Sequence, residues 1–405
     1  MALTRRESLQ LLMAASAAAA AGGAGSARAD VPDVVVGCPN SLTGGFGDNG
    51  QMTCWGVQTA ADMINSQGGI KSLGGAKLKV IVADCSSDNP AQATSVTERM
   101  LQQDHAVVLA GPSTSAMVLA AEVSVEKARV PMVASGYSDA IVERGMKYTF
   151  KITPKGSKLW NFGFDSTVDM MKAAGKTVKT AGIFCASDAV SAGVFKTLPV
   201  EAKRLGVEVD GAALFQMGLT DPSVVVTPVR QRRPDLILLS AALPDTILIM
   251  QALRGLGITT PVIAAGAANS DAAGKALGKA AVGIVMPATY NWDIKEPINK
   301  TLVDLFHKAH GDVHYPPNGD YLGLGFVNML ILAQALEKAA SRDGTKIRDA
   351  MSSTTFTDLP VIGGKAKFDE TGYNSIVQGL IGEWVSQDEI RTVWPKEYQT
   401  VAPKL

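Results

Sequence analysis

A repeated alternation of short apolar runs with longer amphipathic segments constrains the fold of this chain most. Four runs are rich in valine, isoleucine and alanine, as buried strands are: 34–37, 78–82, 106–110 and 130–134. Three segments between them carry apolar residues at helical spacing: 51–65, 91–103 and 115–128. Asn89 followed by Pro90 is typical of a helix start. Strands that alternate with helices predict a parallel sheet with right-handed crossovers and helices on both faces.

The same alternation restarts after residue 150. Strands are predicted at 180–185, 207–215, 236–239 and 261–265, and helices at 192–205, 222–233 and 246–256. Pro228 predicts a kink in the second of these helices. Two later helices, 296–309 and 321–340, precede a closing hairpin of 376–385 with 390–394. The fold class is therefore α/β, with two doubly wound parallel-sheet lobes. Ligands of such sheets bind beyond the carboxyl ends of the strands, in the cleft that the lobes leave.

The first 29 residues have the features of an export signal. Arg5 and Arg6 precede an uncharged tract at 11–24, which is followed by the small-x-small pattern Ala27-Arg28-Ala29. The tract is too short for a membrane span of ~20 residues. Residues 1–29 thus resemble a twin-arginine signal peptide. We expect a mature chain that starts at Asp30 and is soluble in the periplasm.

Charge and motif content exclude several classes of function. The chain has 38 basic and 38 acidic residues, which does not favour a nucleic-acid partner. It lacks the glycine-rich nucleotide motifs and the G-x-S-x-G nucleophile motif, so we predict no cofactor and no enzymatic activity. His307, His310 and His314 would share a helix face, but Gly311 is expected to end that helix, so no metal site is predicted.

Four cysteines, Cys38, Cys54, Cys85 and Cys185, show no C-x-x-C spacing. An oxidising compartment permits disulfides between them without requiring any. A bridge between Cys38 and Cys85, which end two predicted strands, and four buried inert thiols remain alternative interpretations.

Several motifs occur together, in a fixed order and at a fixed spacing. They occupy 36–50, 60–70, 89–91, 111–115, 130–136 and 148–152. In this order they resemble periplasmic leucine/isoleucine/valine-type binding proteins, the branched-chain amino acid substrate-binding proteins of ABC importers. The resemblance implies a type I periplasmic binding protein fold with two lobes joined by three crossover strands. It also implies a monomer that traps a small-molecule ligand by hinge closure and delivers it to a membrane permease.

The resemblance also suggests where the chain passes between the lobes. Crossings are expected near Lys151, Pro287 and Val361. The N-terminal lobe would then comprise 30–151 plus 287–360. The C-terminal lobe would comprise 152–286 plus 361–405.

Four candidate ligand-binding residues match family positions in the first lobe. Ser115 matches the serine that holds the ligand carboxylate, and it begins a predicted helix whose free N–H groups favour an anion. Gly136 and Ser138 match a backbone carbonyl and a hydroxyl that contact the ligand, and Asn49 stands where relatives often carry an aromatic residue. An ordinary helix cap at Ser115 and ordinary turns at the other three positions are the alternative interpretations.

The second lobe departs from the family pattern. Val190 stands where amino-acid binders carry a tyrosine. After the strand that begins at Pro261, Asn269 is the first polar side chain and Asp271 the first acid. Because an unpaired buried ammonium costs several kcal/mol, the pattern favours a small organic acid, aromatic acids included.

Tyr137, Tyr290 and Trp292 are candidate apolar walls for such a ligand, or simple packing at the lobe edge. Two further alternatives remain open. One is a true amino acid-binding protein in which Asp271 or another acid completes the site. The other is an extracellular sensor subunit that feeds a chemoreceptor or kinase.

Overall fold

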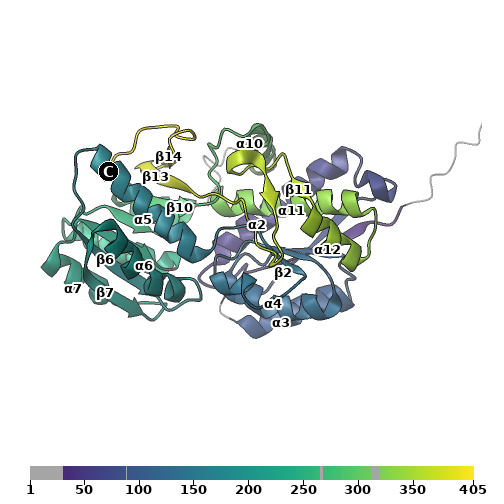
Figure 1. The fold of residues 1–405 in the computed structure, drawn as a ribbon, viewed down its shortest axis with the longest axis horizontal. Coiled ribbons are helices and arrows are strands. Elements are labelled where there is room, and N and C mark those ends of the chain that lie inside the picture. The colour runs from purple at the N-terminus through teal and green to yellow at the C-terminus, as the bar shows by residue number, and fades with distance from the viewer. Residues whose placement is uncertain (1–30, 88, 265–267, 312–318) are drawn as a thin grey trace, which may run out of the picture.

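The computed structural model describes residues 31–87, 89–264, 268–311 and 319–405. The expected signal peptide at 1–29 and His314 lie outside these ranges. Figure 1 shows two lobes side by side along the long axis of the molecule, each built on its own sheet. The predicted α/β class is confirmed.

The first lobe is built on a five-stranded parallel sheet. Its strands are β1 (Val34–Asn40), β2 (Leu78–Asp84), β3 (Val108–Ala110), β4 (Met132–Ala134) and β5 (Thr149–Lys151). They lie in the order β2-β1-β3-β4-β5, and every neighbouring pair is parallel. The predicted parallel sheet of this half therefore forms.

Helices cover both faces of this sheet. One core contains apolar residues of α2 (Gly47–Ser66), α10 (Pro297–His310), α11 (Gly319–Ala339) and α12 (Gly344–Ser353). On the other face, α3 (Pro90–Gln102) and α4 (Ser115–Ala128) bury a second set. Among the described helices, only α11 is long and apolar enough to cross a membrane. Because 78% of that stretch is buried inside the fold, it resembles the core helix of a globular domain.

The second lobe is built on a seven-stranded sheet. Five strands are parallel: β6 (Thr180–Ala186), β7 (Glu208–Phe215), β8 (Leu236–Ser240), β9 (Val262–Ala264) and β10 (Ile284–Ala288). The hairpin of β13 (Leu380–Ser386) and β14 (Glu389–Trp394) adds antiparallel to β10. The predicted closing hairpin forms, although β13 begins at Leu380 and not at 376.

Alternation along the strands of this sheet separates two cores. Ile183 and Cys185 of β6 face α5 (Gly156–Ala173) and α6 (Ser191–Leu205). Phe184 and Ala186 contribute to the opposite core, which includes α7 (Ser223–Arg232), α8 (Leu243–Gly255) and α9 (Asp271–Leu277). Successive side chains of a strand point to opposite faces, so one strand serves both cores.

Short elements complete the fold. They are β11 (Thr355–Phe356), β12 (Ala366–Lys367) and the 3-10 segments η1 (Lys71–Leu73), η2 (Asp139–Val142), η4 (Gly278–Ala281) and η5 (Ile362–Gly364). The strands β11 and β12 pair only with each other.

The third crossing between the lobes lies later in the chain than expected. Val361 packs in the core of the first lobe, and so does Phe368, whose ring contacts Phe150 at 5.1 Å between centroids. Tyr373 bridges to Lys151 of β5, and the chain then continues to β13 in the second lobe. Aromatic packing keeps this segment in the first lobe, so the boundary expected near Val361 is corrected to a point after residue 374.

The cysteines do not form the Cys38–Cys85 bridge. All four are buried and free. Cys38 faces α2, where its sulfur lies 3.4 Å from that of Cys54, whereas Cys85 packs with Met117 on the other side of the sheet. Burial raises the pKa of both Cys85 and Cys185 to about 12, so these side chains are protonated thiols at neutral pH.

Candidate functional site

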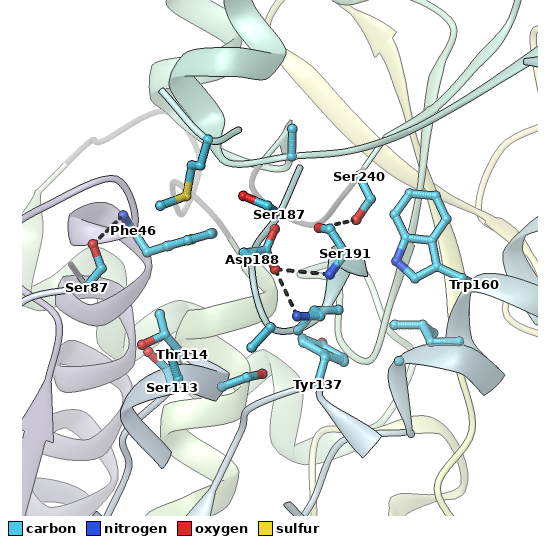
Figure 2. A pocket seen from close by; sticks show the side chains of 18 of the residues that line it. Phe46, Ser87, Ser113, Thr114, Tyr137, Trp160, Ser187, Asp188, Ser191 and Ser240 are labelled. Atoms are coloured by element: carbon cyan, nitrogen blue, oxygen red, sulfur yellow. Dashed lines mark hydrogen bonds between the residues drawn. The ribbon is translucent and has the colours of Figure 1, made fainter. Parts of the chain in front are cut away.

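A cavity of about 320 Å³ lies between the two lobes, and both contribute to its walls. The first lobe supplies residues from the start of α4 and from the loops that follow β1, β2 and β4. The second lobe supplies α5 and the loops that follow β6 and β8. Figure 2 shows these side chains directed toward a common space. The volume is in the range of small-molecule sites.

The first-lobe wall is formed by the N-terminus of α4. Thr114 is the N-cap, but its hydroxyl bonds Ser41 at 3.1 Å and not the helix, so the N–H groups of the first turn keep their capacity to donate. Ser115 Oγ accepts the backbone N–H of Ser138 at 2.9 Å, which leaves the hydroxyl hydrogen available. Ser113 Oγ is buried and has no partner among the described residues. These donors, together with the positive end of the helix dipole, can hold a carboxylate.

Two local features hold this wall in place. Asn40 at the end of β1 accepts the backbone N–H of Ser113 at 2.9 Å. Gly136 lets the loop after β4 approach α4, because a Cβ there would lie 3.1 Å from Ser115 Cα and 2.7 Å from the Ile141 side chain. Any larger residue at Gly136 would displace the hydroxyl of Ser115.

Tyr137 and Asp320 connect the cavity wall to the segment that follows β10, near Pro287, where the second crossing between the lobes is expected. The Tyr137 hydroxyl donates to Asp320 Oδ2 at 2.6 Å. Asp320 Oδ1 accepts the backbone N–H groups of Thr289 and Tyr290, at 3.0 and 2.8 Å. Burial raises the pKa of Asp320 to about 6, although all three donors favour the carboxylate. At neutral pH Asp320 is therefore ionised, with its oxygens already engaged by the protein.

The second-lobe wall presents a differently placed carboxylate. Asp188 follows the end of β6, and its Oδ1 accepts the N–H groups of Val190 and Ser191 at 2.9 and 3.0 Å. Behind it, the hydroxyls of Ser191 and Ser240 hydrogen-bond each other at 2.7 Å. The two bonds to the start of α6 hold Asp188 in the cavity wall (Figure 2).

The remaining lining is largely apolar. Phe46 comes from the first lobe, and Leu159, Trp160 and Met217 come from the second. Among the described residues that line the cavity there are two acids and no lysine, arginine or histidine. The cavity therefore combines an apolar body with negative charge and one helix N-terminus.

The structure brings some of the predicted site residues together. Ser115, Tyr137 and Val190 line the cavity, and Gly136 and Ser138 lie directly behind Ser115. Asn49 does not line the cavity. Its side chain hydrogen-bonds the side chain of Tyr321, and Tyr321 lines the cavity.

Three other predicted residues lie elsewhere. Tyr290 packs in the first-lobe core, and its hydroxyl donates to Asn299 at 2.6 Å. Trp292 donates from its indole N–H to the Ile390 carbonyl oxygen, which agrees with the alternative interpretation of packing at the lobe edge. Asn269 is fully buried outside the cavity wall, and its amide has no partner among the described residues. The Asp271 side chain and 265–267 lie outside the described part.

Sequence reasoning missed Asp188, Asp320, Phe46 and Trp160. Asp188 carried a usable signal, because it comes three residues after the strand predicted at 180–185, at the edge where ligands of such sheets bind. The other three had no local signal. Phe46 precedes α2, and Asp320 lies in the first turn of α11. Trp160 lies in a helix whose position relative to the cavity depends on the tertiary fold.

The histidine pair on α10 serves packing. His310 stacks on Trp55 with 4.1 Å between ring centroids, and His307 contacts the edge of Phe306. In the described part of the chain, no group of three His, Cys, Asp or Glu residues is arranged to hold a metal ion.

Two α/β lobes with a ligand-sized cavity between them are the architecture of periplasmic binding proteins. A model of the periplasmic binding protein family matches residues 33–385, so the chain belongs to that family. The amino acid binding protein of Pseudomonas aeruginosa is 25% identical over 87% of this chain and 90% of that protein.

Solved structures agree on the fold. The leucine binding protein of Thermotoga maritima has a TM-score of 0.76 and 22% identity over 89% of this chain and 97% of that one. A solute binding protein from R. palustris, in complex with benzoate, has a TM-score of 0.75 and 17% identity over 92% and 98%. The resemblance to leucine/isoleucine/valine-type binding proteins is thus confirmed.

Proposed function

We propose that this protein is the periplasmic solute-binding subunit of an ABC importer and that its ligand is a small solute bearing a carboxylate. The observation that carries the proposal is the first-lobe wall, where the N-terminus of α4 and the hydroxyls of Ser113 and Ser115 converge on one cavity. A helix N-terminus with additional hydroxyl donors is a favourable carboxylate site.

Binding is expected to close the two lobes on the ligand. Each lobe supplies one wall of the cavity, so a ligand that contacts both walls stabilises the closed form by the contacts made only there. The chain would then deliver its ligand, unaltered, to a membrane permease. The export signal expected at 1–29 supports a periplasmic location, and we expect the exported protein to act as a monomer.

A true amino acid-binding protein is the second candidate. Asp188 favours it, because a carboxylate in the cavity wall can accept from a ligand ammonium. The name of the Pseudomonas aeruginosa relative points the same way, whereas the benzoate complex of the R. palustris protein favours an aromatic acid.

The test begins with a thermal-shift panel of amino acids, aromatic acids, short dicarboxylates and the amide of each acid. Ligands stabilise by mass action, so carboxylates should raise the melting temperature and their amides should not. Calorimetry of the best ligand should then show that Ser115→Ala weakens binding by roughly 1–3 kcal/mol, the range for a buried charge-assisted hydrogen bond. Ser66→Ala, at an exposed serine outside the cavity, is the matched control. Equal binding of acids and amides, or unchanged affinity in Ser115→Ala, would contradict the proposal.

A further inference from the structure

Asp188 has one carboxylate oxygen committed to the protein and one available to a ligand. Oδ1 accepts both helix N–H groups, whereas Oδ2 makes no hydrogen bond to a described residue. Three serines of the same wall are engaged with partners of their own. The Ser191 and Ser240 hydroxyls bond each other, and Ser187 donates to Gln216. Oδ2 is thus the acceptor that the second-lobe wall offers to a ligand.

The charge of Asp188 is not compensated inside the cavity. No described basic side chain forms an ion pair with it, and none lines the cavity. Asp320, the other acid of the wall, is itself negative at neutral pH and already accepts three hydrogen bonds. A carboxylate ligand would therefore bring a further negative charge into a cavity that already holds two.

Lobe closure would remove Asp188 Oδ2 from water. A buried, charged carboxylate oxygen without a hydrogen-bond donor is unfavourable, even though Oδ1 keeps its two N–H donors. Asp188 cannot turn away without losing its two bonds to the start of α6. A ligand hydroxyl or ammonium, placed opposite the ligand carboxylate's own site at α4, supplies that donor.

We propose that Asp188 is a specificity-determining residue, which selects carboxylic acids that also carry a hydroxyl or ammonium donor within reach of its Oδ2. This inference rests on the proposed function, because it assumes that the ligand carboxylate is held at Ser115. It narrows the substrate class to hydroxy acids and amino acids, and it excludes plain apolar acids such as benzoate as preferred ligands.

The experiment compares matched acids that differ only in the donor. One series is 4-methylpentanoate, 2-hydroxy-4-methylpentanoate and leucine, a second is 3-phenylpropanoate, 3-phenyllactate and phenylalanine, and a third is benzoate and 4-hydroxybenzoate. Calorimetry measures the dissociation constant of each acid for the wild type and for Asp188→Asn. Asparagine keeps an oxygen for the N–H groups of Val190 and Ser191, so this variant is expected to fold and to differ mainly in charge.

In at least one series the wild type should bind a donor-bearing acid at least about tenfold more tightly than the plain acid. Asp188→Asn should reduce this preference to below about threefold and should improve binding of the plain acid. Equal affinities across every series in the wild type, or an unchanged preference in Asp188→Asn, would overturn the inference.

The two proposals fail in different ways. In one outcome, acids bind and Ser115→Ala weakens the binding of all of them, but Asp188→Asn leaves the preference for donor-bearing acids unchanged. The inference then fails and the proposed function stands. If no acid of these series and none of the thermal-shift panel binds, both are overturned together.

Discussion

Glu383 on β13 allows a quantitative test of how burial controls ionisation in this fold. Its side chain is fully buried, and both carboxylate oxygens lie 3.0 Å from the backbone N–H of Lys404. Burial raises its pKa from 4.5 to about 7. The carboxyl lies outside the ligand cavity, so its effect on stability can be measured without interference from binding.

The sign and size of the effect follow from linkage. The folded chain holds this proton more tightly than the unfolded chain, so the stabilisation is fully present below pH 4.5 and is lost as the pH rises to about 7. At roughly 1.4 kcal/mol for each tenfold change in proton affinity, the loss is about 3 kcal/mol. Burial raises the pKa of Glu122 to about 7 and that of Asp320 to about 6. Both groups therefore also make the free energy of unfolding fall as the pH rises.

Urea unfolding of the ligand-free protein between pH 4.5 and pH 8 measures the effect. Glu383→Gln mimics the protonated side chain. It should match the wild type at pH 4.5 and exceed its free energy of unfolding by about 3 kcal/mol at pH 8. Glu208→Gln, at an exposed strand position, is the control for the loss of one glutamate. A difference between Glu383→Gln and the wild type that does not change with pH would refute the reasoning.

Two further predictions concern packing. Gly325→Ala should lower the free energy of unfolding by roughly 2–3 kcal/mol, because its Cβ would lie 2.1 Å from the Thr53 carbonyl oxygen where α11 crosses α2. Gly193→Ala on α6, where a Cβ meets nothing within 4 Å, should cost no stability; equal effects of the two in chemical denaturation would contradict this packing. Tyr290→Phe should lower the free energy of unfolding by roughly 1–2 kcal/mol, because the buried Asn299 Oδ1 loses its hydrogen-bond donor. Ligand affinity in calorimetry should stay unchanged. A clear loss of affinity would show that Tyr290 belongs to the binding site.

Much of the fold could be predicted because strands and helices of an α/β protein differ in local pattern. Each buried parallel strand is a short β-branched run, and each amphipathic helix repeats its apolar residues near every 3.6 positions. The helix α5 was missed because residues 156–173 mix polar residues and glycines with apolar ones. There, Gly163 faces Pro287 of β10, a contact with no signal in the local sequence.

The lobe boundary and half of the site depend on contacts between distant residues. The third crossing is set by the contact of Phe368 with Phe150, more than 200 positions apart in the chain. Ser115 could be predicted because it matches a family position and begins a helix whose free N–H groups favour an anion. Asp320 could not, because only the tertiary fold brings it to the hydroxyl of Tyr137.

The charge of the cavity decides how the two lobes can share one ligand. The first lobe offers a helix N-terminus and hydroxyl donors, which attract a carboxylate, while the second offers Asp188, which repels one. A ligand with both an acidic and a donor group satisfies the two walls only when it lies across the cavity in one direction. Each lobe alone makes only part of these contacts, so the free energy gained on joining them is available only in the closed form. The same opposition of donors and acceptor that selects the ligand therefore also couples its binding to closure.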